Sequence, residues 1–200
     1  MQLQRYKIFF LFIFILNNFV VSCTDNPGLK SGDQNAGLKS VANTKTMANE
    51  IEVGSKAPDF SLPDQTGKRV NLSDFLGKVN IVVYFYPKDE SFGCTKEACG
   101  FRDAYEDFKE AGAEVIGISA DDIASHQAFA ANHKLPFILL SDKGKAVAEK
   151  YNVGKSLGVI PGRVTYVIDK EGIIRMVFSS QINFQKHVDE ALIILKQLKN

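Results

Sequence analysis

Residues 84–99 read YFYPKDESFGCTKEAC and join the end of an apolar run to the start of a helical pattern. The run, residues 79–86, has no polar alternation after Asn80, as expected for a central strand covered on both faces. The helical pattern extends over residues 95–111. A buried strand that leads directly into a helix is typical of an α/β domain.

The rest of the sequence repeats this alternation. Further strands are predicted at residues 114–119, 164–169 and 173–178. Further helices are predicted at residues 123–133, 144–151 and 186–198. Residues 60–67 and 69–72 predict a hairpin with a glycine turn in front of the core. The expected fold is α/β, with helices packed against a central sheet.

Composition excludes some function classes. The 200 residues are 45% hydrophobic and 24% charged, with 24 Lys and Arg against 23 Asp and Glu. Such a chain can build one ordinary core. It has no long basic block, so we expect no nucleic-acid partner.

The N-terminus resembles a targeting sequence. Arg5 and Lys7 precede an apolar stretch at residues 8–16, and residues 20–23 read VVSC. The pattern predicts a signal peptide over residues 1–22. The VVSC segment is similar to a bacterial lipobox, which predicts lipidation of Cys23, a membrane-surface anchor and a location in a bacterial cell envelope. The alternatives are an ordinary secretory signal, the first part of a plastid-targeting leader in a eukaryote, or a retained anchor.

A linker separates this leader from the folded part. Residues 23–50 are dominated by Gly, Asn, Ser, Lys and Thr, a composition typical of a flexible tether. The folded domain is predicted at residues 51–200, which is a usual length for one domain.

Cys94 lies where the predicted loop enters a helix. Unpaired N–H groups and the helix dipole at that position favour the thiolate, which is the nucleophilic form of cysteine. An inert buried cysteine is the alternative, but Ser91, Gly93, Thr95 and Lys96 make the surroundings polar. We therefore expect Cys94 to be reactive.

The spacing of Cys94 and Cys99 indicates a transient bond. In one helix, residues five apart have Cα atoms about 8.6 Å apart. A disulfide needs a Cα separation below about 7 Å. If both cysteines belong to one helix when reduced, its first turns must unwind before they bond, and a static disulfide is disfavoured.

Two segments carry a family resemblance that covers essentially the whole domain. Residues 84–103 read YFYPKDESFGCTKEACGFRD, and residues 161–170 read PGRVTYVIDK. Both are similar to segments of the peroxiredoxins, specifically the bacterioferritin-comigratory, or Q-type, atypical two-cysteine branch. The resemblance implies a thioredoxin-like fold with a central mixed sheet.

The resemblance also implies site residues and a reaction. Cys94 would be the peroxidatic cysteine and Cys99 the resolving cysteine, with Pro87, Ser91 and Arg163 completing the pocket. The implied activity is reduction of hydrogen peroxide and organic hydroperoxides through a Cys94 sulfenic acid and a Cys94–Cys99 disulfide. Thioredoxin or a similar protein would reduce that disulfide. The branch implies no metal, flavin or haem cofactor and a monomeric protein, acting in antioxidant defence.

Two positions depart from the family pattern. Ser91 stands where threonine is usual and keeps the hydroxyl, whereas Phe92 stands where proline is usual and changes the mouth of the pocket. Glu97 either holds Arg163 in place or is a solvated carboxylate on the helix surface, and both readings stay open.

Other classes of protein remain as alternatives. A copper-binding assembly factor would need the two cysteines and a histidine, but His126, His133 and His187 are expected on exposed helices, and the cysteine spacing differs from C-x3-C. A thiol-disulfide oxidoreductase is disfavoured by the absence of C-x-x-C. A non-catalytic adhesion or scaffold module is the remaining alternative.

Overall fold

The computed structural model describes residues 51–156 and 160–199. Five strands form the central sheet: β3 (Asn80–Phe85), β4 (Ala113–Ser119), β5 (Ile138–Ser141), β8 (Val164–Ile168) and β9 (Ile174–Ser179). Two small antiparallel pairs lie outside it: β1 (Ser61–Pro63) with β2 (Arg69–Asn71), and β6 (Lys155–Ser156) with β7 (Ile160–Pro161). The helices are η1 (Leu72–Asp74), α1 (Phe92–Asp103), α2 (Tyr105–Glu110), α3 (Ile123–His133), α4 (Ala146–Lys150) and α5 (Phe184–Leu198).

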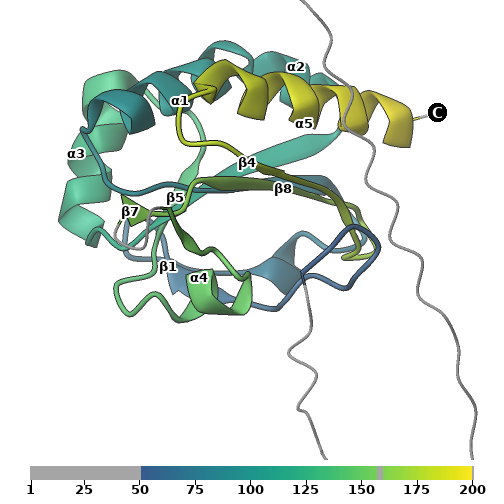
Figure 1. Ribbon diagram of the computed structural model, residues 1–200, viewed down its shortest axis with the longest axis horizontal. Coiled ribbons are helices and arrows are strands. Elements are labelled where there is room, and N and C mark those ends of the chain that lie inside the picture. The colour runs from purple at the N-terminus through teal and green to yellow at the C-terminus, as the bar shows by residue number, and fades with distance from the viewer. Residues whose placement is uncertain (1–50, 157–159, 200) are drawn as a thin grey trace, which may run out of the picture. The chain divides into compact units, whose positions relative to one another are not determined.

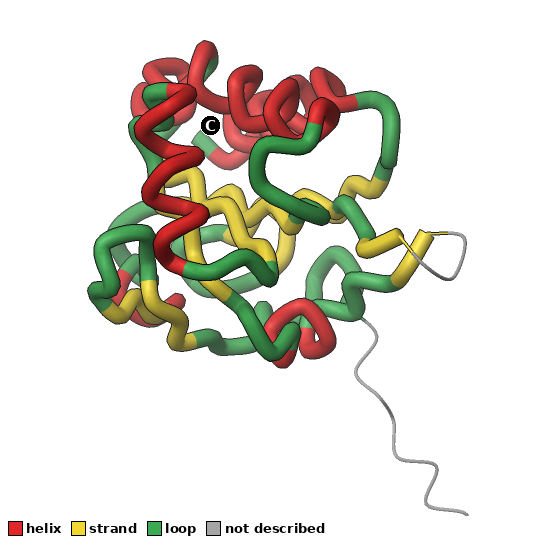
Figure 2. The backbone as a smooth tube through the Cα atoms, turned by 90° about the vertical axis from the view of Figure 1, so that its left-hand side faces the viewer, coloured by secondary structure: helices red, strands yellow, loops and turns green. Residues whose placement is uncertain are grey.

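The central sheet is mixed, in the order β5-β4-β3-β8-β9. Strands β3, β4 and β5 run parallel, and β8 runs antiparallel to β3 and to β9. Helices α1, α2 and α5 cover one face, while α4 and the β1–β2 hairpin lie against the other (Figure 1). Seen from the side, most of the helical segments lie on one side of the strands (Figure 2). This is the α/β, thioredoxin-like arrangement that the sequence predicts.

Strand β3 divides the core into two halves. All six of its residues are buried. Val82 and Tyr84 pack into the cluster under α1, α2, α3 and α5, while Ile81, Val83 and Phe85 pack into the cluster with the hairpin and α4. Burial on both faces explains the run without polar alternation.

The edge of the sheet at β5 is covered by the hairpin turn. Gln65 donates from Nε2 to the carbonyl of Phe137 at 3.1 Å and accepts from the backbone N–H of Leu139 at 2.9 Å. These bonds occupy backbone groups that an exposed edge strand would leave unpaired.

The structure differs from the predicted elements in the cysteine helix, in α4 and in β5, and the short β6–β7 pair was also not predicted. The helix predicted at residues 95–111 begins earlier, at Phe92, and breaks at Ala104 into α1 and α2. Beyond the break, Tyr105 donates to Glu114 on β4 at 2.7 Å while Phe108 stays buried, so the chain turns toward the sheet. Helix α4 is shorter than the helix predicted at residues 144–151, and strand β5 was not predicted.

The predicted leader and linker, including Cys23, lie outside the described residues. Within the described part of the chain, no helix has the length and apolar character needed to cross a bilayer.

Candidate active site

Strand β3, the loop after it and helix α1 present Cys94. The strand ends at Phe85, and α1 begins at Phe92 with Ser91 as its N-cap residue. Cys94 is the third residue of the helix and is only 1% exposed. The first N–H groups of a helix have no acceptor within it, so the sulfur lies at the positive end of the helix dipole, beside N–H groups that the helix itself leaves without an acceptor.

Arg163 reaches the same sulfur from the segment just before β8. Its Nη2 atom donates to Sγ of Cys94 at 3.2 Å. Arg163 is 3% exposed, and its guanidinium lies 5.0 Å from the ring centre of Phe184 on α5. A cation that is always charged and shielded from water interacts strongly with a negative sulfur or oxygen beside it.

Glu97 holds Arg163 from the next turn of α1. Its Oε2 atom forms an ion pair with Nη1 of Arg163, and its side chain is completely buried. Burial raises the pKa of Glu97 to about 7, although Arg163 acts to lower it. Of the two readings left open by the sequence, the structure therefore supports the one in which Glu97 positions Arg163.

Gly93 allows this close approach. A Cβ atom at Gly93 would lie 2.8 Å from the ring of Phe184 and 3.3 Å from Nη2 of Arg163. We expect Gly93→Ala to displace Arg163 and slow the oxidation of Cys94 by peroxide on the order of 10- to 100-fold, measured by stopped-flow fluorescence.

Gly100→Ala is the matched control for that substitution. Its Cβ would also be tight, at 3.3 Å from Val188 on α5, but it would not touch Arg163. An equal slowing in both variants would mean that any strain between α1 and α5 is enough, and would contradict a specific role for Gly93.

Ser91, Pro87 and Phe92 surround the loop and the start of the helix. The Ser91 hydroxyl donates to the carbonyl of Lys88 at 2.9 Å, which leaves its oxygen able to accept. Pro87 is half-buried and lines an apolar cavity beside the end of β3. Phe92 is 74% exposed at the first helical position, with Lys96 Nζ 4.3 Å from its ring centre. The helix thus starts at this position without proline.

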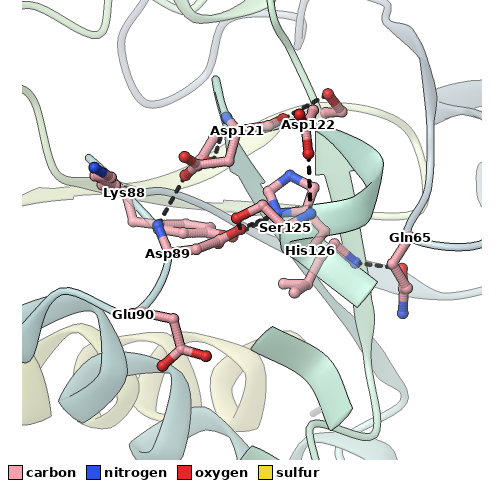
Figure 3. A network of polar contacts seen from close by, with 12 residues as sticks. Gln65, Lys88, Asp89, Glu90, Asp121, Asp122, Ser125 and His126 are labelled. Atoms are coloured by element: carbon pink, nitrogen blue, oxygen red, sulfur yellow. Dashed lines mark hydrogen bonds and ion pairs between the residues drawn. The ribbon is translucent and has the colours of Figure 1, made fainter. Parts of the chain in front are cut away.

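The loop between β3 and α1 is held by a buried polar network centred on Asp89 (Figure 3). The backbone N–H of Asp89 donates to Asp121 at 2.8 Å. Its carboxylate accepts from Tyr86 and Ser125, each at 2.7 Å, and lies 2.8 Å from Nδ1 of His126. Burial opposes ionisation of Asp89, but the bonds from His126, Tyr86 and Ser125 outweigh it and lower its pKa. The network fixes the loop against α3.

The end of the loop is tied to the last turn of α3. Glu90 has a positive φ of 56° and accepts from Asn132 at 2.9 Å, and its carboxylate lies 2.8 Å from Nε2 of His133. The bonds from His133 and Asn132 lower the pKa of Glu90. A strained backbone position is thus held by two side chains immediately before α1.

The prediction that the three histidines lie on exposed helices is wrong. His126 and His187 are completely buried, and His133 is only 23% exposed. His126 and His187 lie on helix faces that turn inward, where both ring nitrogens have partners, whereas His133 at the end of α3 contacts Glu90 through Nε2. Among the described residues, no three His, Cys, Asp or Glu side chains form a metal-binding group.

Cys99 is half-buried on the same helix as Cys94, and both thiols are free. It lines an open groove between α1 and α5 together with Phe184 and the exposed side chains of Ile182 and Ile193. The peroxidatic candidate is therefore shielded, while the resolving candidate lies at the surface.

Sequence reasoning missed Asp89 and His187. The spacing of His187, Ala191 and Leu195 could have placed this histidine on the buried stripe of the last helix, because residues four apart share a face. Asp89 had no comparable signal, since it lies in a loop and all its partners except Tyr86 are more than 30 positions away.

Comparison with known sequences gives the family. Residues 53–177 match the AhpC/TSA family. The chain is 54% identical over 151 residues to a chloroplastic peroxiredoxin Q of Sedum lineare, covering 75% of this chain and 81% of that protein. It is 51% identical over 158 residues to a chloroplastic peroxiredoxin Q of Triticum aestivum, covering 78% and 72%.

Solved structures agree with the sequence relatives. Peroxidoxin BcpB of Mycobacterium tuberculosis is 37% identical with a TM-score of 0.71, covering 75% of this chain and 99% of that one. Bacterioferritin comigratory protein of Xanthomonas campestris is 29% identical with a TM-score of 0.67, covering 75% and 98%. The chain therefore belongs to the AhpC/TSA family and, within it, to the peroxiredoxin Q branch of thiol peroxidases.

Proposed function

We propose that Cys94 is the peroxidatic cysteine of this peroxidase. Its thiolate attacks one oxygen of the peroxide, the O–O bond breaks, and the sulfur becomes a sulfenic acid while the other oxygen leaves as hydroxide or alkoxide. The observation that carries the proposal is the 3.2 Å contact between Arg163 and the sulfur at the start of α1. The same guanidinium stabilises the thiolate and then the departing oxygen.

Ser91 and Pro87 complete the proposed pocket. The Ser91 oxygen accepts a hydrogen bond from the peroxide hydroxyl, since its own hydrogen is donated to the carbonyl of Lys88. Pro87 fixes the loop through its locked φ and limits water access from the end of β3.

Cys99 then resolves the sulfenic acid. Its thiol attacks the sulfur of Cys94, a disulfide forms and one water leaves. Because both residues lie in α1, with Cα atoms about 8.6 Å apart by helix geometry, the first turns must unwind before the sulfurs meet.

An external dithiol protein of the thioredoxin type resets the enzyme. Its thiolate attacks the disulfide to give a mixed disulfide, and its second thiol releases the reduced peroxidase. The substrates are hydrogen peroxide and organic hydroperoxides. Alkyl peroxide reduction is attributed to the Xanthomonas campestris relative, which supports the organic substrates.

Substitution of Cys99 tests the two-cysteine cycle. We expect Cys99→Ser to be oxidised by one equivalent of peroxide at nearly the wild-type rate and then to stop as a sulfenic acid, because no second thiol is present. Dimedone labelling followed by mass spectrometry would place a single adduct on Cys94. Unchanged steady-state turnover with thioredoxin would contradict Cys99 as the resolving residue.

The N-terminal segment is proposed to be a leader followed by a linker, with the catalytic domain at residues 51–200. The family match at residues 53–177 supports that boundary. The chloroplastic relatives favour a plastid-targeting leader over a lipid anchor on Cys23. Mass spectrometry of the mature N-terminus decides between them, since a diacylglyceryl group on Cys23 would overturn plastid targeting.

A further inference from the structure

The carboxyl group that holds Arg163 has a second, unexplained neighbour on α5. Oε2 of Glu97 is paired with Arg163, but Oε1 is buried and has no hydrogen-bond partner among the described residues. The atom facing Oε1 is Nδ1 of His187, at 3.4 Å. Both side chains are completely buried, so water does not screen the contact.

The other contacts of His187 fix where its hydrogens lie. Nε2 is 2.9 Å from the carbonyl oxygen of Ser180, which can only accept, so Nε2 carries a hydrogen. In the neutral ring Nδ1 then carries no hydrogen, and its lone pair faces both Glu97 and the hydroxyl of Thr165, which lies 2.8 Å away. An ionised Glu97 would therefore point an anionic oxygen at a lone pair in a dry site, an arrangement that a proton between the two atoms relieves.

We propose that His187 is a positioning residue of the peroxidatic site, and that it shares one proton with Glu97. The proton keeps the carboxyl group against the guanidinium while only part of the Arg163 charge is neutralised. The remaining positive charge faces the Cys94 sulfur and the departing oxygen. The catalytic part of this inference rests on the roles proposed above for Cys94 and Arg163.

The surroundings are consistent with one proton in the pair. Four side chains surround Glu97. They are Arg163 just before β8, His187 on α5, Tyr84 on β3 and Cys94 on α1. Burial raises the pKa of Glu97 to about 7 and lowers that of His187 to about 4. Burial also raises the pKa of Tyr84 well above its usual value, so that hydroxyl stays neutral.

Folding therefore redistributes one proton between His187 and Glu97 without changing the total number of protons that the two residues bind. Between about pH 4.5 and 6.5 the unfolded chain carries a proton on His187 and none on Glu97. The folded chain carries one on the pair. Glu97 alone makes stability fall as pH rises through this window, His187 alone makes it rise, and the two effects cancel.

Urea unfolding of the full chain as a function of pH tests the shared proton without reference to catalysis. As pH rises from 4.5 to 6.5, the folding equilibrium constant of Glu97→Gln should rise relative to that of wild type, by up to about tenfold per pH unit. The folding equilibrium constant of His187→Gln should fall relative to wild type by up to about the same factor. The double variant should run parallel to wild type. If Glu97→Gln also runs parallel to wild type, the pair holds no proton and the inference is overturned.

The pH dependence of Cys94 oxidation by hydrogen peroxide tests the consequence for the site. Once the pair loses its proton, a full carboxylate neutralises Arg163, so the wild-type rate should decline with an inflection near pH 7. Glu97→Gln, which mimics the protonated acid, should lack this inflection. Persistence of the inflection in Glu97→Gln would rule out the pair as its origin.

Two substitutions of His187 distinguish the role of Nδ1 from that of Nε2. The asparagine amide lies where Nδ1 was, whereas the glutamine amide lies near the position of Nε2. We expect His187→Asn to keep the inflection and His187→Gln to shift it to lower pH, because the acid then lacks an acceptor. Equal profiles in the two variants would make His187 merely structural. If no variant or wild type reacts with peroxide but the stability slopes hold, the proposed function fails and the shared proton stands.

Discussion

Replacement of Cys94 by serine is expected to remove peroxidase activity, by a factor on the order of 10⁴ or more. Serine has nearly the same shape, so the contacts of α1 with Arg163 and Phe184 can persist. A serine hydroxyl is not ionised at neutral pH and cannot become a sulfenic acid. Peroxide consumption coupled to reduced thioredoxin measures the loss.

The design separates chemistry from folding. Thermal unfolding of Cys94→Ser should lie close to wild type, because the substituted side chain is small and fits the same site. Cys99→Ser is the control, since it retains the first oxidation but not turnover. Substantial turnover by Cys94→Ser would show that another group reduces peroxide, and the assignment of the site would be wrong.

The fold was largely predictable because its decisive strand is unambiguous. Strand β3 is buried on both faces, and its apolar run is followed after a short loop by the cysteine helix. The elements that were missed depend on partners distant in sequence. Strand β5 has only four residues and is stabilised by Gln65, more than 70 positions away. The break at Ala104 likewise depends on where Tyr105 meets Glu114.

The candidate site could be proposed from the sequence where its residues carry a local chemical pattern. Cys94 stands out by its place at the start of a helix, and Cys99 stands out by its spacing from Cys94. The role of Glu97 could not be decided, because a carboxylate on a helix surface and one buried against an arginine look alike in sequence. His187 was wrongly assigned to an exposed face, because its partners are Thr165 on β8 and Ser180 just after β9, which the pattern of the last helix does not reveal.

Loop positioning is the part of the site most dependent on tertiary structure. Asp89 joins the cysteine loop to α3 through Ser125 and His126, and Glu90 adds a second tie at His133. Short polar loops give no periodic signal, so only the folded protein reveals which side chains meet. These contacts explain how the loop before α1 stays fixed although Phe92 occupies the position where proline is usual.

Replacement of Arg163 by methionine is expected to slow the oxidation of Cys94 by roughly 10²- to 10³-fold, the range found when one donor to a developing oxyanion is removed. The guanidinium contacts the sulfur at 3.2 Å and is shielded from water, so its loss affects both the thiolate and the departing oxygen. Stopped-flow measurement of the second-order rate constant with hydrogen peroxide gives the size of the effect.

The difficulty with this variant is that it also removes the partner of Glu97. Because Arg163 lowers the pKa of that buried carboxyl group, its loss raises the pKa and Glu97 becomes protonated, which limits the destabilisation. The double variant Arg163→Met, Glu97→Gln replaces both charges with neutral groups, so its stability should recover relative to the single variant. Its rate should stay low if Arg163 acts on the reacting atoms. Recovery of the rate together with stability would show instead that Arg163 only compensates a buried carboxylate, and Arg163→Lys, which keeps the charge without the two-pronged geometry, should fall between wild type and Arg163→Met.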